Sequence, residues 1–189
     1  MKLIDFQKTK DGKYLKNYEL SYENKVGAIK KYEIVSRHNL NGIEELGLSS
    51  SGVSIIATCD DKLLLLKEFR MGVNRTIYNL CAGMMEDGET TEECVKRELY
   101  EETGLQLKRM KKLLPPSYAA VAISDVSTSI AIVEVEGELQ SGHTSANEEI
   151  QAALYTKEEV KSLLEANEPF SSRAQIAAYF FAIGALKLV

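Results

Sequence analysis

The sequence has 189 residues, a length that suits one domain with a small N-terminal appendage. Hydrophobic residues make up 44% and charged residues 27% of the chain, which provides for a packed core and excludes the composition of a disordered protein. The formal net charge of −5 argues against a nucleic-acid polymer as partner, because binding to a phosphate backbone depends on clustered lysine and arginine.

The cysteines and the apolar segments indicate a soluble, cytoplasmic protein. Cys59, Cys81 and Cys94 are an odd number without zinc-ligand spacing, so we expect reduced, mostly buried thiols. The first 27 residues contain no apolar segment typical of a signal peptide. The apolar run from Ala174 to Val189 is too short to cross a bilayer and predicts a buried helix or a subunit contact. We expect no membrane partner.

In chain order, strands are predicted from alternating polar and apolar residues and from short apolar runs. Asp60 and Asp61 lie between two of these runs and predict a hairpin turn. The expected strands cover residues 14–20, 32–37, 53–57, 63–66, 77–81 and 127–135.

Three capping boxes predict where helices begin. Thr90 with Glu93 predicts a helix that starts near Thr91, and Gly104 supplies the left-handed residue that ends it. The other two boxes, each with its helix, are Thr156 with Glu159 for residues 157–166, and Ser172 with Gln175 for the C-terminal helix.

The first predicted helix carries an acidic face. Glu98, Glu101 and Glu102 are three or four residues apart, so they project from neighbouring positions, and Glu89 lies just upstream. Like charges at these spacings destabilise a helix by a few tenths of a kcal/mol per pair, roughly. The cluster therefore favours a bound cation, and hard oxygen ligands select Mg²⁺ or Mn²⁺.

The segment from Gly83 to Leu105 resembles the signature of the Nudix hydrolases, with every defining position filled. Seven positions demand one residue type each, so a chance match is on the order of 10⁻⁹ per starting position. The matching residues are Gly83, Glu89, Arg97, Glu98, Leu99, Glu101, Glu102, Gly104 and Leu105.

The resemblance implies roles for the acidic face. Glu98 and Glu102 correspond to metal ligands, and Glu101 is close enough to join them or to act on water. The backbone carbonyl of Ala82 is a further implied ligand. The implied chemistry is attack of water on a pyrophosphate, assisted by bound cations that lower the pKa of water and neutralise phosphate charge.

Arg97 and Glu89 match the family's internal ion pair, which ties the loop to the helix and orients the ligands. The resemblance also implies the fold: an α/β class Nudix-type α/β/α sandwich with a mixed sheet in residues 45–189. Residues 1–44 would form a small N-terminal antiparallel sheet, as in the ADP-ribose pyrophosphatase branch. In that branch the extra sheet often joins two subunits, so we expect a homodimer.

Residues outside the signature resemble the substrate-binding segments of the same branch. Arg70 matches an arginine that contacts the substrate's phosphates, although a surface arginine at a strand end is an alternative. Tyr32 and Arg37 match an aromatic platform and an arginine at the nucleotide base. For the tyrosine, packing within the sheet is an equal alternative.

The chain departs from this branch in two loops. Ala120 stands near the position of a family proline, which weakens the specific expectation of ADP-ribose. Glu148 matches a late metal ligand, but Ala146 stands where the family has a catalytic glutamate. Either Glu149 or Glu101 then serves as base; alternatively, the late acidic residues are solvated loop charges.

The leading hypothesis is a magnesium-dependent hydrolase, with Mn²⁺ as an alternative metal, that cleaves a nucleoside diphosphate linked to another moiety. ADP-ribose or a nucleotide sugar is the expected substrate. The alternatives are a GDP-mannose or dinucleotide pyrophosphatase, and a non-catalytic Nudix-fold sensor that binds an ADP-ribose-type nucleotide.

Overall fold

The computed structural model describes residues 1–48, 50–140 and 149–188. The chain divides into two compact units. The N-terminal unit comprises residues 1–51 together with 115–128, and the core unit comprises residues 52–114 together with 129–189. The second segment of the N-terminal unit comes from within the predicted Nudix domain, and the division at residues 44 and 45 stays a prediction. No helix among the described residues is long and apolar enough to cross a membrane.

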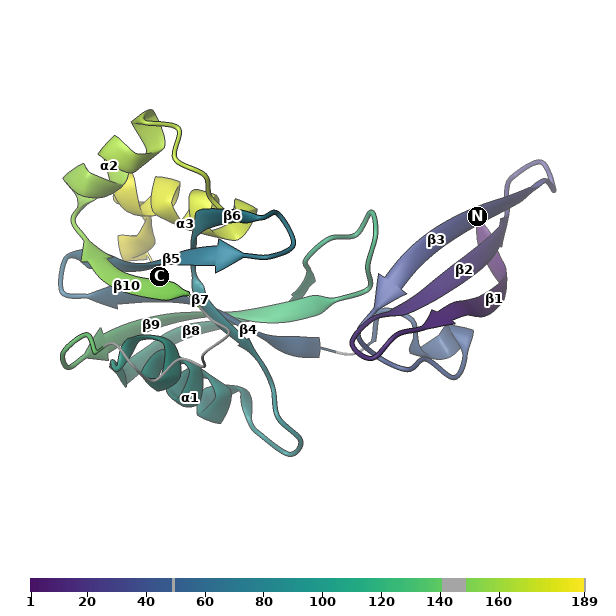
Figure 1. Ribbon diagram of the computed structural model, residues 1–189, viewed down its shortest axis with the longest axis horizontal. Helices are drawn as coiled ribbons and strands as arrows, with labels where there is room; N and C mark the ends of the chain where they lie inside the picture. The colour runs from purple at the N-terminus through teal and green to yellow at the C-terminus, as the bar shows by residue number, and fades with distance from the viewer. Residues whose placement is uncertain (49, 141–148, 189) are drawn as a thin grey trace. The chain divides into compact units, whose positions relative to one another are not determined.

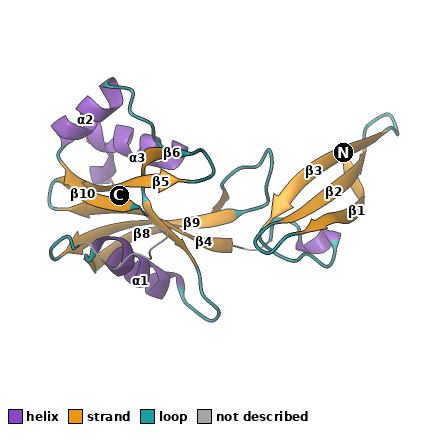
Figure 2. Ribbon diagram, viewed as in Figure 1, coloured by secondary structure: helices purple, strands orange, loops and turns teal. Residues whose placement is uncertain are grey.

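The N-terminal unit contains a three-stranded antiparallel sheet in the order β1-β2-β3 (Figure 2). Its strands are β1 (Lys2–Asp11), β2 (Lys16–Glu23) and β3 (Ile29–Ser36). A short 3₁₀ helix, η1, covers Ile43–Glu45. The core of the N-terminal unit consists of four buried side chains: Tyr18, Leu20, Ile34 and Leu40.

The core unit is built on a seven-stranded sheet in the order β10-β5-β4-β9-β8, with β6 beside β5 and β7 beside β4 (Figure 1). The predicted hairpin turn at Asp60 and Asp61 is present, because Thr58 pairs with Leu63 directly across it. The strands are β4 (Ser50–Cys59), β5 (Lys62–Arg70), β6 (Arg75–Asn79), β7 (Cys81–Met84), β8 (Gln106–Tyr118), β9 (Ser127–Glu136) and β10 (Ile150–Tyr155).

Helices cover both faces of this sheet, which confirms the predicted α/β/α sandwich. Helix α1 (Thr91–Thr103) lies on one face, and α2 (Lys157–Glu165) and α3 (Ser172–Ala182) lie on the other (Figure 1). A short 3₁₀ helix, η2 (Ala185–Leu188), follows α3. All side chains of β5 from Leu63 to Leu66 are buried, as expected for a strand covered on both faces.

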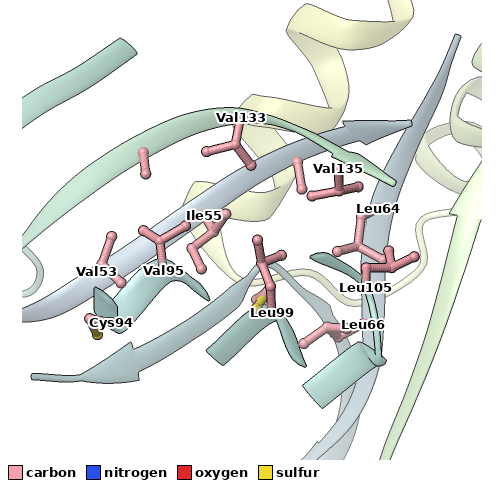
Figure 3. Close-up of a cluster of buried hydrophobic side chains, with 13 residues drawn as sticks. Val53, Ile55, Leu64, Leu66, Cys94, Val95, Leu99, Leu105, Val133 and Val135 are labelled. Carbon is pink, nitrogen blue, oxygen red and sulfur yellow. The ribbon is translucent and has the colours of Figure 1, made fainter. Parts of the chain in front are cut away.

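The alternation of side chains along β5 divides the interior into two cores. Leu64 and Leu66 belong to the core beneath α1, where they join Val95 and Leu99 of the helix (Figure 3). Leu63 and Leu65 belong to the core beneath α2 and α3. Burial of these side chains is the main attraction that fixes α1 against the sheet, since each is worth about 1.5–3 kcal/mol.

Two sequence predictions need correction, and three strands were not predicted. The predicted strand 77–81 is two strands, β6 and β7, because the chain leaves the β5 edge at Leu80 and pairs with β4. The C-terminal helix is capped by Ser171, whose hydroxyl accepts from the Ala174 amide, rather than by Ser172. Strands β1, β8 and β10 were not predicted: lysine and aspartate fill half of β1, and β8 contains the turn signal Pro115 with Pro116.

Candidate functional site

Helix α1 holds its acidic face in a fixed position against the sheet. The predicted capping box is present at Thr90, whose side chain accepts from the Glu93 amide while the Glu93 carboxylate accepts from the Thr90 amide. Gly104 ends the helix with φ +76°. Between these ends Val95 and Leu99 are fully buried. The helix is therefore held at both ends and along its inner face.

Glu98 lies directly on the backbone of β7. It is buried, with 9% of its surface exposed, and a Cβ at Gly83 would come within 1.6 Å of its Oε1 atom. Only glycine at position 83 leaves room for the Glu98 carboxylate. Because β7 pairs with β4, with Gly83 opposite Val53, the backbone is also held from its other edge.

Glu102 lies one turn further along the helix, next to the same strand. Its Oε2 atom accepts a hydrogen bond from the Ala82 amide at 3.1 Å, and the Cys81 thiol donates to its carboxylate. Burial, with a further contribution from the Glu98 charge, raises the pKa of Glu102 to about 8. Burial also raises the pKa of Glu98. Glu98 and Glu102 thus place two carboxylates with raised pKa values beside β7, where added positive charge is favourable.

Arg97 binds the remaining carboxylates of the acidic face. Its guanidinium donates to both oxygens of Glu89, at 2.8 and 2.9 Å, so the predicted ion pair is present. It also donates to Glu98 at 2.7 Å and to Glu101 at 3.2 Å. The hydrogen bonds from Arg97, with the Glu86 amide as a second donor, lower the pKa of Glu89 to about 2. Arg97 also donates to the Met84 carbonyl at 2.9 Å, and so joins helix and loop.

The donor set fits a hard divalent cation. Within residues 1–48, 50–140 and 149–188, no three His, Cys, Asp or Glu side chains converge closely enough to hold a metal by themselves. The group at α1 instead offers two carboxylates, from Glu98 and Glu102, beside the backbone at Ala82 and Gly83. Mg²⁺ is usually bound by one or two carboxylates, with further oxygen ligands from water and substrate phosphates.

Arg70 stands at the end of β5 and is held by a residue that sequence analysis missed. Its Nη1 atom donates to Glu68 at 2.5 Å, and Glu68 in turn accepts from the Asn79 amide group at 2.9 Å. Glu68 is buried, with 7% of its surface exposed. The only carboxylate of β5, two residues before Arg70 and on the same side of the strand as Leu64 and Leu66, is the sequence signal that would have revealed it.

The two late acidic residues have different outcomes. Glu148 lies outside the described residues. Glu149 has an exposed side chain, and its carbonyl accepts from the Phe69 amide at 3.0 Å, which places it beside the end of β5. Glu101 is also exposed and ion-paired with Arg97. The choice between Glu101 and Glu149 as base stays a prediction.

Tyr32 and Arg37 belong to the N-terminal unit. The Tyr32 hydroxyl donates to the Ala122 carbonyl at 2.5 Å, and the ring lines a pocket of about 290 Å³. Asp125 also lines this pocket, and its buried Oδ1 atom has no hydrogen-bond partner in the part of the chain that the structure describes. Arg37 is exposed. Their positions in the N-terminal unit do not test the prediction that Tyr32 and Arg37 bind the nucleotide base.

The comparisons with known proteins agree with this geometry. The model of the NUDIX domain matches residues 48–177. An ADP-ribose pyrophosphatase of Bacillus subtilis (strain 168) is 28% identical over 130 residues, which cover 68% of this chain and 70% of that protein. An ADP-ribose pyrophosphatase of Escherichia coli (strain K12) is 30% identical over 125 residues, or 62% of this chain and 59% of that protein.

A solved structure described as an ADP compounds hydrolase has the same fold. It superimposes with a TM-score of 0.75 at 20% identity and covers 98% of this chain and 94% of its own. The family match and these relatives together indicate a pyrophosphohydrolase, built here with an acidic helix packed on a mixed sheet. The chain belongs to the Nudix family, in its ADP-ribose pyrophosphatase-like branch.

Gly83→Ala tests whether the close contact with Glu98 matters. The added methyl group must displace the Glu98 carboxylate, so we expect kcat/KM to fall by about 10²-fold, as for a misplaced reacting group. Gly137→Ala is the matched control, because Gly137 has φ +101° and open space around it. The control loses about 1–2 kcal/mol of stability through backbone strain, yet should retain full activity. Equal activity losses in the two variants would contradict this account.

Glu89→Gln tests the ion pair through the pH dependence of stability. The Glu89 pKa is lowered from 4.5 to about 2, so the pair stabilises the folded state above about pH 4.5 and loses this effect as the pH falls towards 2. Chemical denaturation should show the variant less stable than wild type at pH 6, with the difference shrinking below pH 4.5. A difference that does not depend on pH would rule out the ion pair as its cause.

Proposed function

We propose that the protein hydrolyses the pyrophosphate bond of a nucleoside diphosphate linked to another moiety, with ADP-ribose or a nucleotide sugar as substrate. The observation that carries this proposal is that the Glu98 and Glu102 carboxylates, whose pKa values are raised by burial, lie against the backbone of Gly83 and Ala82 in β7. The names of the Bacillus subtilis and Escherichia coli relatives, ADP-ribose pyrophosphatase, support the substrate class. So does the ADP-sugar pyrophosphatase of Mus musculus, which is 27% identical over 133 residues.

Glu98, Glu102 and the Ala82 carbonyl would hold Mg²⁺ or, in its place, Mn²⁺. When bound, such an ion supplies neutralisation of phosphate charge and lowers the pKa of water. Arg97 orients Glu98 through a hydrogen bond of 2.7 Å and is itself fixed by both oxygens of Glu89. This support keeps the ligand oxygens in place before substrate arrives.

The proton acceptor for the attacking water is Glu149 or Glu101. Glu149 lies beside the end of β5 through its backbone, with its carboxylate exposed and available to a substrate. Glu101 accepts from Arg97 at 3.2 Å, so its carboxylate is already engaged in an ion pair with a residue that also binds Glu89 and Glu98. We therefore favour Glu149, and we propose Glu148 as a further metal ligand on the resemblance alone.

Arg70 is the proposed contact to the substrate's phosphates, because more than half of its side chain is exposed at a strand end, and the charge of its partner Glu68 acts on Glu102. We propose that Tyr32 and Arg37 bind the nucleotide base. The pocket beside Tyr32 supports this, since the unsatisfied Asp125 oxygen offers an acceptor to a hydrogen-bond donor of the ligand. We also infer a homodimer and a cytoplasmic location; the first rests on the family resemblance and the second on the three free thiols.

The test is a product-release assay over a panel of nucleoside diphosphate derivatives with Mg²⁺. We expect two phosphate-containing products and a metal requirement. Glu102→Gln should lower kcat by about 10²–10³-fold, the size of effect that follows loss of one electrostatic group at a reacting centre. Glu92→Gln, on the same helix and exposed beside Lys96, is the matched control and should behave like wild type.

Two results would contradict the proposal. Near wild-type turnover by Glu102→Gln would remove the metal site from α1. Binding of an ADP-ribose-type nucleotide without turnover under any metal condition, seen as a thermal shift, would make the protein a sensor rather than an enzyme.

A further inference from the structure

A chain of polar contacts runs from the start of α3 to Arg70 through the interior of the core unit. The Ser171 hydroxyl donates to the Asn79 side-chain oxygen at 2.7 Å. The amide nitrogen of the same Asn79 side chain donates to Glu68 Oε2 at 2.9 Å. Arg70 Nη1 then donates to Glu68 Oε1 at 2.5 Å. Three elements, α3, β6 and β5, are joined in this way.

Each atom in the chain has a defined donor or acceptor role, which fixes the orientation of the Asn79 amide. Its oxygen accepts from Ser171 and also from the Leu80 backbone amide at 3.0 Å. Its nitrogen therefore faces Glu68, where it donates to one of the two carboxylate oxygens, Oε2. The other oxygen is left for Arg70.

The residues joined by these hydrogen bonds differ sharply in burial. Glu68 is 7% exposed, and a buried carboxylate is stable only when charged or polar partners satisfy its oxygens. The Arg70 side chain is 53% exposed. Its guanidinium has five N–H donors, and the contact with Glu68 uses Nη1. The inner edge of Arg70 is thus anchored, while the outer edge faces solvent.

The neighbouring strand adds positive charge at the same place. Arg75 of β6 is paired directly opposite Arg70 in the antiparallel register, and it is exposed. Like charges directly opposite each other destabilise a sheet. An anionic ligand at this end of the β5–β6 hairpin would relieve that repulsion, which agrees with phosphate binding there.

We propose that Glu68, held by Asn79, is a positioning residue that aims the Arg70 guanidinium at the phosphate groups of the substrate. The inference rests on the proposed function, because it concerns how that substrate is bound. A free arginine side chain loses rotamer entropy when it binds, and an anchored one has lost most of it beforehand. Glu68 therefore acts on substrate affinity through Arg70, without touching the substrate.

The test uses three single variants, Glu68→Gln, Asn79→Ala and Arg70→Ala. Two double variants combine Arg70→Ala with Glu68→Gln and with Asn79→Ala. Glu68→Gln should raise KM by about ten-fold with kcat within about three-fold of wild type, because a substrate contact is loosened and the chemistry is spared. Asn79→Ala should raise KM less. In the Arg70→Ala background, neither change should raise KM further.

Glu134→Gln is the matched control, because Glu134 is ion-paired with Arg109 on strands β9 and β8 of the same unit. It makes the same chemical change, carboxylate to amide beside an arginine, and should leave KM unchanged. Thermal unfolding of each variant checks that it is folded. If Glu68→Gln does not fold, Asn79→Ala with and without Arg70→Ala carries the test alone.

Three results would overturn the inference. The first is an unchanged KM in Glu68→Gln or, if that variant does not fold, in Asn79→Ala. The second is a KM that rises by the same factor with and without Arg70, as for a general loss of structure. A shift of about ten-fold or more in the Mg²⁺ concentration for half-maximal rate, the size that follows loss of a residue supporting a metal site, would assign Glu68 to the metal site instead. Each of these is distinguishable from failure of the proposed function, in which wild-type protein hydrolyses none of the substrates.

Discussion

The close approach of Glu98 to Gly83 is the contact on which the candidate site depends. A side chain on residue 83 would occupy the space of the carboxylate, so the strand and the helix can meet here only through glycine. The pairing of β7 with β4 holds the strand side, and burial of Val95 and Leu99 holds the helix side. The hydrophobic core thus fixes the polar site, although no core residue takes part in its chemistry.

Charge is distributed unevenly over the acidic face. Arg97 binds Glu89, Glu98 and Glu101, and so satisfies most of the negative charge at the loop end of the helix. Glu102 is held instead by the neutral Ala82 amide and the Cys81 thiol. Its raised pKa reflects burial that these contacts do not offset. A divalent cation placed between Glu98 and Glu102 would compensate for this, and would favour the charged form of both.

Local signals predicted the parts of this structure that depend on local physics. The capping boxes at Thr90 and Thr156 are present with both of their hydrogen bonds, because each involves residues only three positions apart. The Glu89–Arg97 pair was found through the family signature. Predictions were wrong where tertiary contacts decide. Leu80 breaks a predicted strand because β7 pairs with β4, and Ser171 takes the cap of α3 while its hydroxyl also binds Asn79. The part of Asn79 in the anchor of Arg70 was not predictable, because Asn79 and Glu68 meet only after β6 pairs with β5.

The central claim is that Glu98, Glu102 and the Ala82 carbonyl bind a divalent cation together. A crystal structure of the protein grown with Mn²⁺ tests it most directly, since anomalous scattering locates the ion without reference to activity. The account predicts a peak at α1 within about 2.0–2.6 Å of oxygens of both carboxylates and of the Ala82 carbonyl. A fully occupied Mn²⁺ elsewhere, with no peak between Glu98 and Glu102, would contradict it.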